Sequence, residues 1–371
     1  MTSPSRPRRA SGTPKFVTGS VLRHILEMTG AGAIGLMAIF LGDLANIYFL
    51  SISGDHTVVA SIGYASSILF FSTSVGIGLS IAASTMVSPA VGANVRSKAR
   101  RLATHAHLLA FGMSAVFSIV LWFFIPWLLD LLGATGRAHA LASVYLAILI
   151  PTLPLLAVGM TSSAVLRSLG DAKRAMFVTL TGAAVNTVLD AILVLKMGLG
   201  VEGAAISTAL ARCAIVAMGL YGVIGVHRLW GAIKPKALDD DARAYFLVVF
   251  PAVLTNIATP VGNAYVTTAV APFGDDAVAG WAVIGRIIPV AFGAIYALSG
   301  SVGPIIGQNL GARQPARMSM ILTQSLLVMG AFTLVAWLLL VILAEPLAAA
   351  FNASGETRAL IVYFCRWLSP M

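Results

Sequence analysis

The chain has 371 residues, of which 58% are hydrophobic and only 10% are charged, and its formal net charge is +10. Soluble domains carry about 25% charged residues, so this composition and the mean hydropathy of +0.91 exclude an ordinary water-soluble protein. The composition predicts an all-α polytopic membrane protein.

Apolar stretches of about 20 residues or more recur down the chain, and each is long enough to cross a bilayer as a helix. The expected spans are residues 26–51, 58–88, 104–132, 140–166, 176–196, 201–227, 243–272, 278–306, 318–344 and 358–371. The first nine are full length, and the last one stops short of a complete crossing. We therefore expect nine to ten helices.

The positive charge follows the order of the spans. Lys and Arg gather in the first 23 residues and in every second connection, at 96–101, 167–174, 228–243 and 313–317. The positive-inside rule places such connections in the cytoplasm. We therefore expect a cell (inner or plasma) membrane protein with a cytoplasmic N-terminus, and the charge needs no nucleic-acid partner.

The sequence lacks the motifs of several other protein classes. Cys213 and Cys365 lie in separate spans, without the spacing of a disulfide framework or a zinc site. No Gly-Lys pair occurs, so there is no nucleotide-binding phosphate loop. An intramembrane enzyme such as a prenyl transferase needs paired metal-binding aspartates at a membrane edge, and the run 239–241 lacks the helical context. The chain is expected to be neither an enzyme nor a metalloprotein.

Two aspartates stand inside apolar segments, Asp43 within 34–50 and Asp190 within 186–195. A carboxylate near mid-bilayer costs about 2.5–3.5 kcal/mol on insertion scales. Asn186 and Asp190 are four residues apart on one helix face, and Asp43 and Asn46 are three apart. Burial and a second carboxylate both favour the protonated form of an acid. The pattern favours ion or proton handling, although simple pairing with Asn or Thr donors inside the bundle is the alternative.

The chain contains an internal repeat. SPAVGAN at 88–94 corresponds to GPIIGQN at 303–309, and 54–58 corresponds to 274–278. Pro126 and Pro151 correspond to Pro346 and Pro370, so the offset is about 215–220 residues throughout. An even number of helices per repeat predicts a parallel relation about an axis along the membrane normal.

The repeat divides the chain into four parts. These are a disordered basic tail (1–21), an N-terminal lobe with six helices (22–230), a cytoplasmic inter-lobe loop (231–242) and a C-terminal lobe (243–371). The second repeat is shorter than the first, so we expect a C-terminal lobe that is truncated relative to a six-helix repeat.

From about residue 22 onward, the chain resembles the multidrug and toxic compound extrusion (MATE) transporters. The residues that carry the resemblance are Gly42-Asp43, LRSLGDAK at 166–173, NTVLD at 186–190, GLGVEGAAIST at 198–208 and GQNLGA at 307–312. The resemblance implies two six-helix lobes around a central cleft that opens alternately to each side. It implies a secondary antiporter that exports amphipathic or cationic drugs or toxic metabolites in exchange for H⁺ or Na⁺.

The resemblance is closer to the DinF-like branch, which has a cation site in the N-terminal lobe. The matching residues are Asp43, Asn186, Asp190, Thr208 and Tyr145. Two asparagines of that site are replaced, by Met160 and Ser163. Arg286 and Asn46 are further candidates for substrate contact or gating. The family implies no cofactor beyond the coupling ion, a small amphipathic substrate, a lipid bilayer around the protein and a monomeric state.

Two alternatives to an exporter stay open. One is a lipid-linked oligosaccharide flippase of the same superfamily, which is expected to have more cations in its cavity. Apart from cations at the very ends of spans, only Arg212, Arg286 and Arg366 lie within the expected spans. The other alternative is an inactive truncated fragment.

Overall fold

A computed structural model describes residues 14–51, 56–351 and 355–369. In these residues every regular element is helical, which confirms the all-α prediction. The elements are α1 (Val21–Ser51), α2 (His56–Gly92), α3 (Arg96–Phe123), α4 (Ile125–Leu131), α5 (Gly136–Leu149), η1 (Ile150–Thr152), α6 (Leu153–Ser168), α7 (Ala172–Asp190), η2 (Ala191–Lys196), α8 (Gly200–Leu220), η3 (Tyr221–Val226), α9 (Pro235–Val270), η4 (Ala271–Phe273), α10 (Asp275–Gly311), α11 (Pro315–Ala350), α12 (Gly355–Tyr363) and η5 (Phe364–Leu368).

Nine helical segments of the described chain are long and apolar enough to cross a membrane. They are Val21–Asn46, Ala60–Gly92, Arg96–Phe123, Gly136–Ser168, Ala172–Lys196, Gly200–Val226, Pro235–Val270, Val283–Gly311 and Pro315–Ala349. Three of them are not uniform α-helices. The fourth is interrupted by the 3₁₀ turn η1 at Pro151, and the fifth and sixth each end in a π-helix, η2 and η3.

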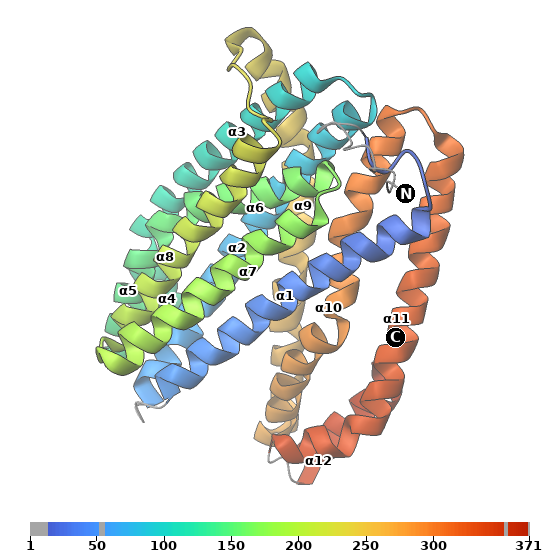
Figure 1. Cartoon of the computed structure of the whole chain (residues 1–371). Coiled ribbons are helices and arrows are strands. Elements are labelled where there is room, and N and C mark those ends of the chain that lie inside the picture. The colour runs from blue at the N-terminus through green and yellow to red at the C-terminus, as the bar shows by residue number, and fades with distance from the viewer. Residues whose placement is uncertain (1–13, 52–55, 352–354, 370–371) are drawn as a thin grey trace, which may run out of the picture.

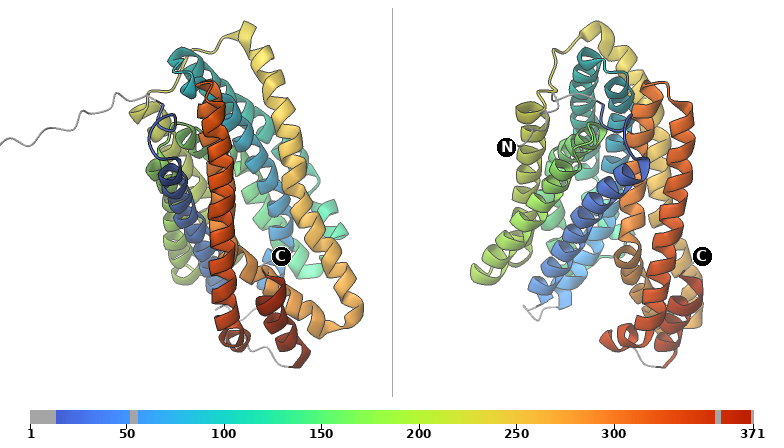
Figure 2. Two further views of the ribbon diagram at one scale, coloured as in Figure 1. Left: turned by 90° about the vertical axis from the view of Figure 1, so that its right-hand side faces the viewer. Right: turned by 45° about the vertical axis from the view of Figure 1, so that its right-hand side comes forward.

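The helices converge at one end of the bundle and splay toward the other, as both views show (Figures 1 and 2). The start of α1 lies at the converged end, which we call the basic end. Among the basic residues that it carries are Lys15, Arg23, Arg96, Lys98, Arg100, Arg101, Arg167, Lys173, Arg174, Arg228, Lys234, Lys236, Arg313 and Arg317.

The repeat is visible in how its helices end. The helices α2 and α10 both have 37 residues. Each is followed by a residue in the left-handed region, Asn94 (φ 58°) and Arg313 (φ 55°). Both turns are closed by the same pair of backbone hydrogen bonds, to the third and fifth preceding carbonyls, which is the usual end of a helix with such a cap.

At the basic end, α2 and α10 cross in close contact through glycines. Gly307 faces Ser88, Gly311 faces the carbonyl of Pro89, and Gly92 faces the carbonyl of Gln308. A Cβ atom at Gly92 or Gly311 would overlap the facing carbonyl oxygen. The two repeated motifs, SPAVGAN and GPIIGQN, therefore pack directly against each other and close this end of the bundle.

Asp171 caps the N-terminus of α7 at the basic end, in the turn that follows α6. Its Oδ1 accepts from the backbone N–H of Arg174 (3.1 Å), and its Oδ2 lies 2.7 Å from Nε2 of His227. Partial burial works to raise the pKa of Asp171, but hydrogen bonds from His227 and Arg174 outweigh it and hold the pKa well below its usual range. The cap therefore joins the α6–α7 turn to the segment that follows η3.

Two boundary predictions were wrong in part. The tail was expected to be disordered over 1–21, but residues 15–20, which we call the strap, pack on the basic end, and Phe16 is 1% exposed. Residues 1–13 lie outside the described residues. The inter-lobe loop was expected over 231–242, but α9 begins at Pro235. Its Asp241 is buried, and the carboxylate is compensated there by Arg101 (3.2 Å) and His105 (2.7 Å) of α3.

Candidate functional site

The predicted acidic site is built around Asp190, the last residue of α7. Helix α1 packs along α7, where Gly35 faces Thr179 and Gly42 faces Thr187. This close packing brings Asp43 and Asn46 of α1 beside Asn186 and Asp190. The chain widens into the π-helix η2 directly after Asp190, and such π segments often occur at functional positions.

The carboxylate of Asp190 is fully buried and accepts hydrogen bonds from three neutral side chains. Its Oδ2 accepts from Nδ2 of Asn46 (2.8 Å) and from Nδ2 of Asn186 (3.0 Å). Its Oδ1 accepts from the hydroxyl of Ser207, which lies within donating reach of the Ala204 carbonyl as well (2.9 Å). A buried charge is tolerated where its lone pairs are satisfied in this way.

The remaining predicted residues surround this centre. Asp43 is exposed and follows Gly42, which packs against Thr187 and Ala183 of α7. Tyr145 is 6% exposed and packs in one buried cluster with Ala204 and Ala205 of α8, close to Thr208. The structure thus brings together the five residues of the predicted cation site.

Arg212 of α8 supports the same region beside Tyr145. It is 6% exposed, and its Nη1 donates to the carbonyl of Leu149 (2.7 Å) and to Oγ1 of Thr152 (2.6 Å). Leu149 directly precedes η1 and Thr152 is its last residue, and between them Pro151 interrupts the helix and frees carbonyl groups. Arg212 therefore fixes the break between α5 and α6 and so the position of Tyr145.

Two further residues were predicted to contact substrate or to act in gating. Asn46 is 8% exposed and bonds Asp190 directly, so it lies within the acidic centre. Arg286 is exposed on α10, in the other half of the chain. No hydrogen bond or ion pair among the described residues joins Arg286 to the acidic centre.

Sequence reasoning missed Ser207, although its neighbour Thr208 was predicted. Serine is common in apolar helices because it can bond a carbonyl of its own preceding turn. The sequence therefore did not indicate that Ser207 contacts Asp190, and the contact is evident only from the packing of α7 against α8.

The arrangement provides oxygen ligands and a proton acceptor. Oδ1 of Asn186 is buried and has no hydrogen-bond partner in the described part of the chain. The carboxylates of Asp43 and Asp190 lie in the same region, and oxygen atoms of this kind suit a hard cation or a proton. Within the described ranges, no group of three or more His, Cys, Asp and Glu is arranged so that it could hold a metal ion.

The fold and this intramembrane acidic centre define a multi-pass membrane transporter built from helices. The MatE family profile matches residues 20–192 and 251–371. The chain therefore belongs to the MatE family, which consists of transporters and not of enzymes.

Curated relatives agree with this assignment. The chain is 29% identical over 350 residues to the FAD transporter of Shewanella oneidensis, an alignment that covers 92% of this chain and 76% of that protein. It is 24% identical over 301 residues to the multidrug export protein MepA of Staphylococcus saprophyticus, covering 79% and 66%. It is 43% identical over 150 residues to an uncharacterized 21 kDa protein of Pseudomonas savastanoi, covering 40% and 50%. The chain thus spans between half and about three quarters of these relatives.

Solved structures share the fold. A point mutant of the Vibrio cholerae MATE transporter VcmN matches with a TM-score of 0.89 at 24% identity, over 94% of this chain and 80% of that one. A MOP superfamily transporter from Pyrococcus furiosus matches with a TM-score of 0.88 at 21% identity, over 97% and 81%. The two-lobe MATE-like fold class is confirmed.

Proposed function

We propose that the chain acts as a secondary antiporter that exports small amphipathic or cationic compounds in exchange for protons, or for Na⁺. The observation that carries the proposal is the acidic centre. Asp190 is wholly buried and held by neutral donors alone, while Asp43 lies beside it and is exposed. One carboxylate that is fixed and one that is accessible suit a site that takes up and releases a coupling ion.

Export would proceed by movement of two lobes, residues 22–230 and 243–371, relative to each other, and the crossing of α2 and α10 is where the lobes meet at the basic end. The basic end would face the cytoplasm of an inner or plasma membrane, in keeping with the positive-inside rule. In this orientation the splayed end faces outward. The proposal includes a monomeric protein in the bilayer and no cofactor apart from the coupling ion.

The test is dye efflux from cells that lack their own exporters, with the protein at matched membrane levels. Asp43→Asn and Asp190→Asn should each abolish efflux that depends on the proton gradient. Thr259→Val, in the second half and away from the acidic centre, is the matched control and should export normally. Efflux at the control rate by both aspartate variants would refute the proposal, and collapse of the Na⁺ gradient instead of the proton gradient distinguishes the two ions.

A flavin nucleotide is a second candidate substrate class. Two observations favour it: the relative named as an FAD transporter aligns with 92% of this chain, and Arg212 places a buried cation beside Tyr145 of the acidic centre. Measuring FAD in the medium of cells with and without the chain tests this candidate. Export of dye without any rise in external FAD would reject it. The relatives named as exporters favour both candidates over the lipid-linked oligosaccharide flippase.

A further inference from the structure

The strap occupies the junction between the two halves of the chain at the basic end. The Phe16 side chain is packed among residues of α1, α7, α10 and α11. Its neighbours in this cluster are Val21, Ile25, Met28, Ala172, Leu298, Ile305, Ile321 and Val328. A single aromatic side chain from the segment before α1 thus fills space between elements that belong to opposite repeats.

The backbone of the strap is bound by polar side chains of the second repeat. The N–H of Phe16 donates to Oε1 of Gln308 (2.9 Å), and its carbonyl accepts from Nδ2 of Asn309 (3.2 Å) and Nη2 of Arg317 (2.9 Å). Nη1 of Arg317 donates to the carbonyl of Gly19 (3.2 Å). Gln308 and Asn309 are both 0% exposed, so this recognition is built into the packed interior.

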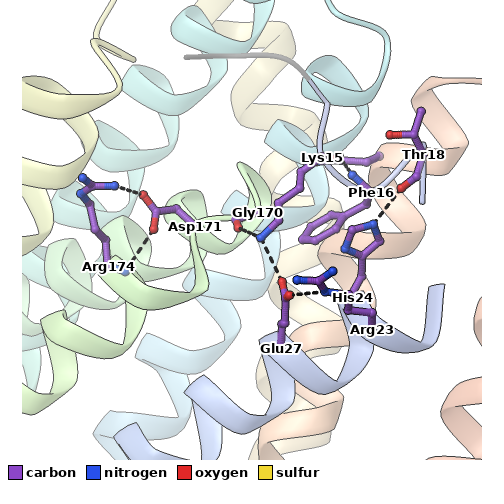
Figure 3. Close-up of polar contacts among 10 residues, drawn as sticks. Lys15, Phe16, Thr18, Arg23, His24, Glu27, Gly170, Asp171 and Arg174 are labelled. Atoms are coloured by element: carbon purple, nitrogen blue, oxygen red, sulfur yellow. Dashed lines mark hydrogen bonds and ion pairs between the residues drawn. The ribbon is translucent and has the colours of Figure 1, made fainter. Parts of the chain in front are cut away.

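The opposite edge of the strap is bound to the first repeat. Nζ of Lys15 donates to the carbonyl of Gly170 (3.2 Å) in the α6–α7 turn and pairs with Glu27 of α1 (3.3 Å) (Figure 3). The ring of Phe16 meets the ring of His24 edge-on at 5.4 Å, and Nε2 of His24 lies 2.8 Å from the carbonyl of Thr18. The strap is therefore fastened on both sides.

Gln308 connects the strap to the helix crossing. While its Oε1 accepts from Phe16, its Nε2 donates to the carbonyl of Ser168 at the end of α6 (2.7 Å). Its own carbonyl lies against Gly92 of α2. One buried amide thus touches the strap, the first repeat and the crossing. The basic end cannot open between α2 and α10 unless Gln308 gives up at least one of these partners.

We propose that the strap is a clasp that holds the basic end closed, and that its release is a required step in opening that end. The inference rests on the proposed function in one respect, because it assumes that the two halves separate at this end during transport. Loss of the clasp is expected to favour the state that is open at the basic end. The clasp acts on a conformational equilibrium and touches neither substrate nor coupling ion.

The test measures the distance across the basic end directly. Spin labels are placed at Lys173→Cys and Ala316→Cys, which are exposed positions on α7 and α11, after Cys213 and Cys365 are replaced by Ser. Arg317→Ala removes two hydrogen bonds to the strap, and Phe16→Ala removes its buried ring. Lys98→Ala is the matched control, because it deletes an exposed charge at the same end.

Arg317 makes two charge-assisted hydrogen bonds to the strap, so Arg317→Ala is expected to raise the ratio of open to closed molecules at least about 10-fold. The distance distribution of Arg317→Ala and of Phe16→Ala should gain a longer component that the control lacks. If Phe16→Ala does not yield folded protein, Lys15→Met cuts only the contacts with Gly170 and Glu27 and should give a smaller shift of the same sign.

Distance distributions of the strap variants that match the control would overturn the clasp. Dye efflux by the chain with an intact strap is measured separately, and its failure would count against the proposed function. The two failures are distinguishable because the distances are recorded in purified protein without any transport.

Discussion

Replacing Asp190 by Asn and by Ala separates the structural role of this residue from its proposed role in coupling. In Asp190→Asn the amide oxygen can keep accepting from Asn46 and Asn186, and the new NH₂ group points to Ser207. The Ser207 hydroxyl can then accept, because it has the carbonyl of Ala204 at 2.9 Å to receive its own hydrogen. All partners stay satisfied, so the free energy of unfolding should change by no more than about 1 kcal/mol.

In Asp190→Ala the two amides lose their acceptor. Each was donating to Oδ2, at 2.8 Å and 3.0 Å, and a buried donor without a partner costs about 1–3 kcal/mol. The sum is about 2–6 kcal/mol, because Ser207 still has Ala204. For a chain of this size such a loss lowers Tm by roughly 5 °C.

Thermal unfolding of both variants in detergent, followed by tryptophan fluorescence, gives the two Tm values, and efflux at matched membrane levels gives the function. We expect Asp190→Asn to be as heat-stable as wild type and inactive in proton-driven efflux. If Asp190→Ala is as stable as Asp190→Asn, the cost assigned to the unpaired Asn46 and Asn186 donors is wrong. Efflux by Asp190→Asn at the wild-type rate would refute the coupling role.

Three further predictions follow from the packing and the charges. Asp171→Asn should lower the free energy of unfolding by about 1 kcal/mol at pH 7. Because folding lowers the pKa of Asp171, this contribution is complete above about pH 3.9, the ordinary value, and is lost as the pH falls through the lower pKa of the folded state. A difference in Tm between the variant and wild type that shrinks already between pH 7 and pH 5 would contradict this prediction. Gly311→Ala should cost about 2 kcal/mol or more because its Cβ would meet the carbonyl of Pro89, whereas Gly330→Ala, in a helix with open space around it, should be neutral or stabilising by up to about 1 kcal/mol; equal Tm values for the two would show that the crossing adapts. Arg286→Ala should leave Tm unchanged, since Arg286 is exposed, and a reduced efflux rate at unchanged Tm is the result expected if it contacts substrate.

Much of the acidic centre was predictable, because its residues can be recognised from the local sequence around each of them. A charged residue inside an apolar span is conspicuous, and the four-residue spacing of Asn186 and Asp190 places both on one face of α7 whatever surrounds them. Asn46 was found in the same way, from its spacing to Asp43. The hydrogen bond from Asn46 to Asp190 was not predictable, because the sequence does not show which face of α1 meets α7; the glycines at 35 and 42 decide that through their close approach to Thr179 and Thr187.

The strap was not predictable, because its composition and its environment point in opposite directions. Residues 1–21 are rich in Ser, Pro and Arg, a composition typical of disorder, and Phe16 is the first large apolar side chain after Met1. Its burial depends on a cavity assembled from residues about 290–310 positions later in the chain, such as Ile305 and Ile321. The early start of α9 was missed for a similar reason, since Asp241 is acceptable in a buried helix only beside Arg101 and His105.

The widened turn after Asp190 has a consequence for how related chains are compared. A π-helix is equivalent to an α-helix that has received one additional residue, so residues 191–196, the end of the fifth span, do not continue the α-helical register of Asn186 and Asp190. A related chain that continues as a regular α-helix here would differ by a single-residue gap within 191–196. In such a chain the motif NTVLD at 186–190 would be followed by side chains rotated by about 100° around the helix, and identical letters after the gap would mark different neighbours.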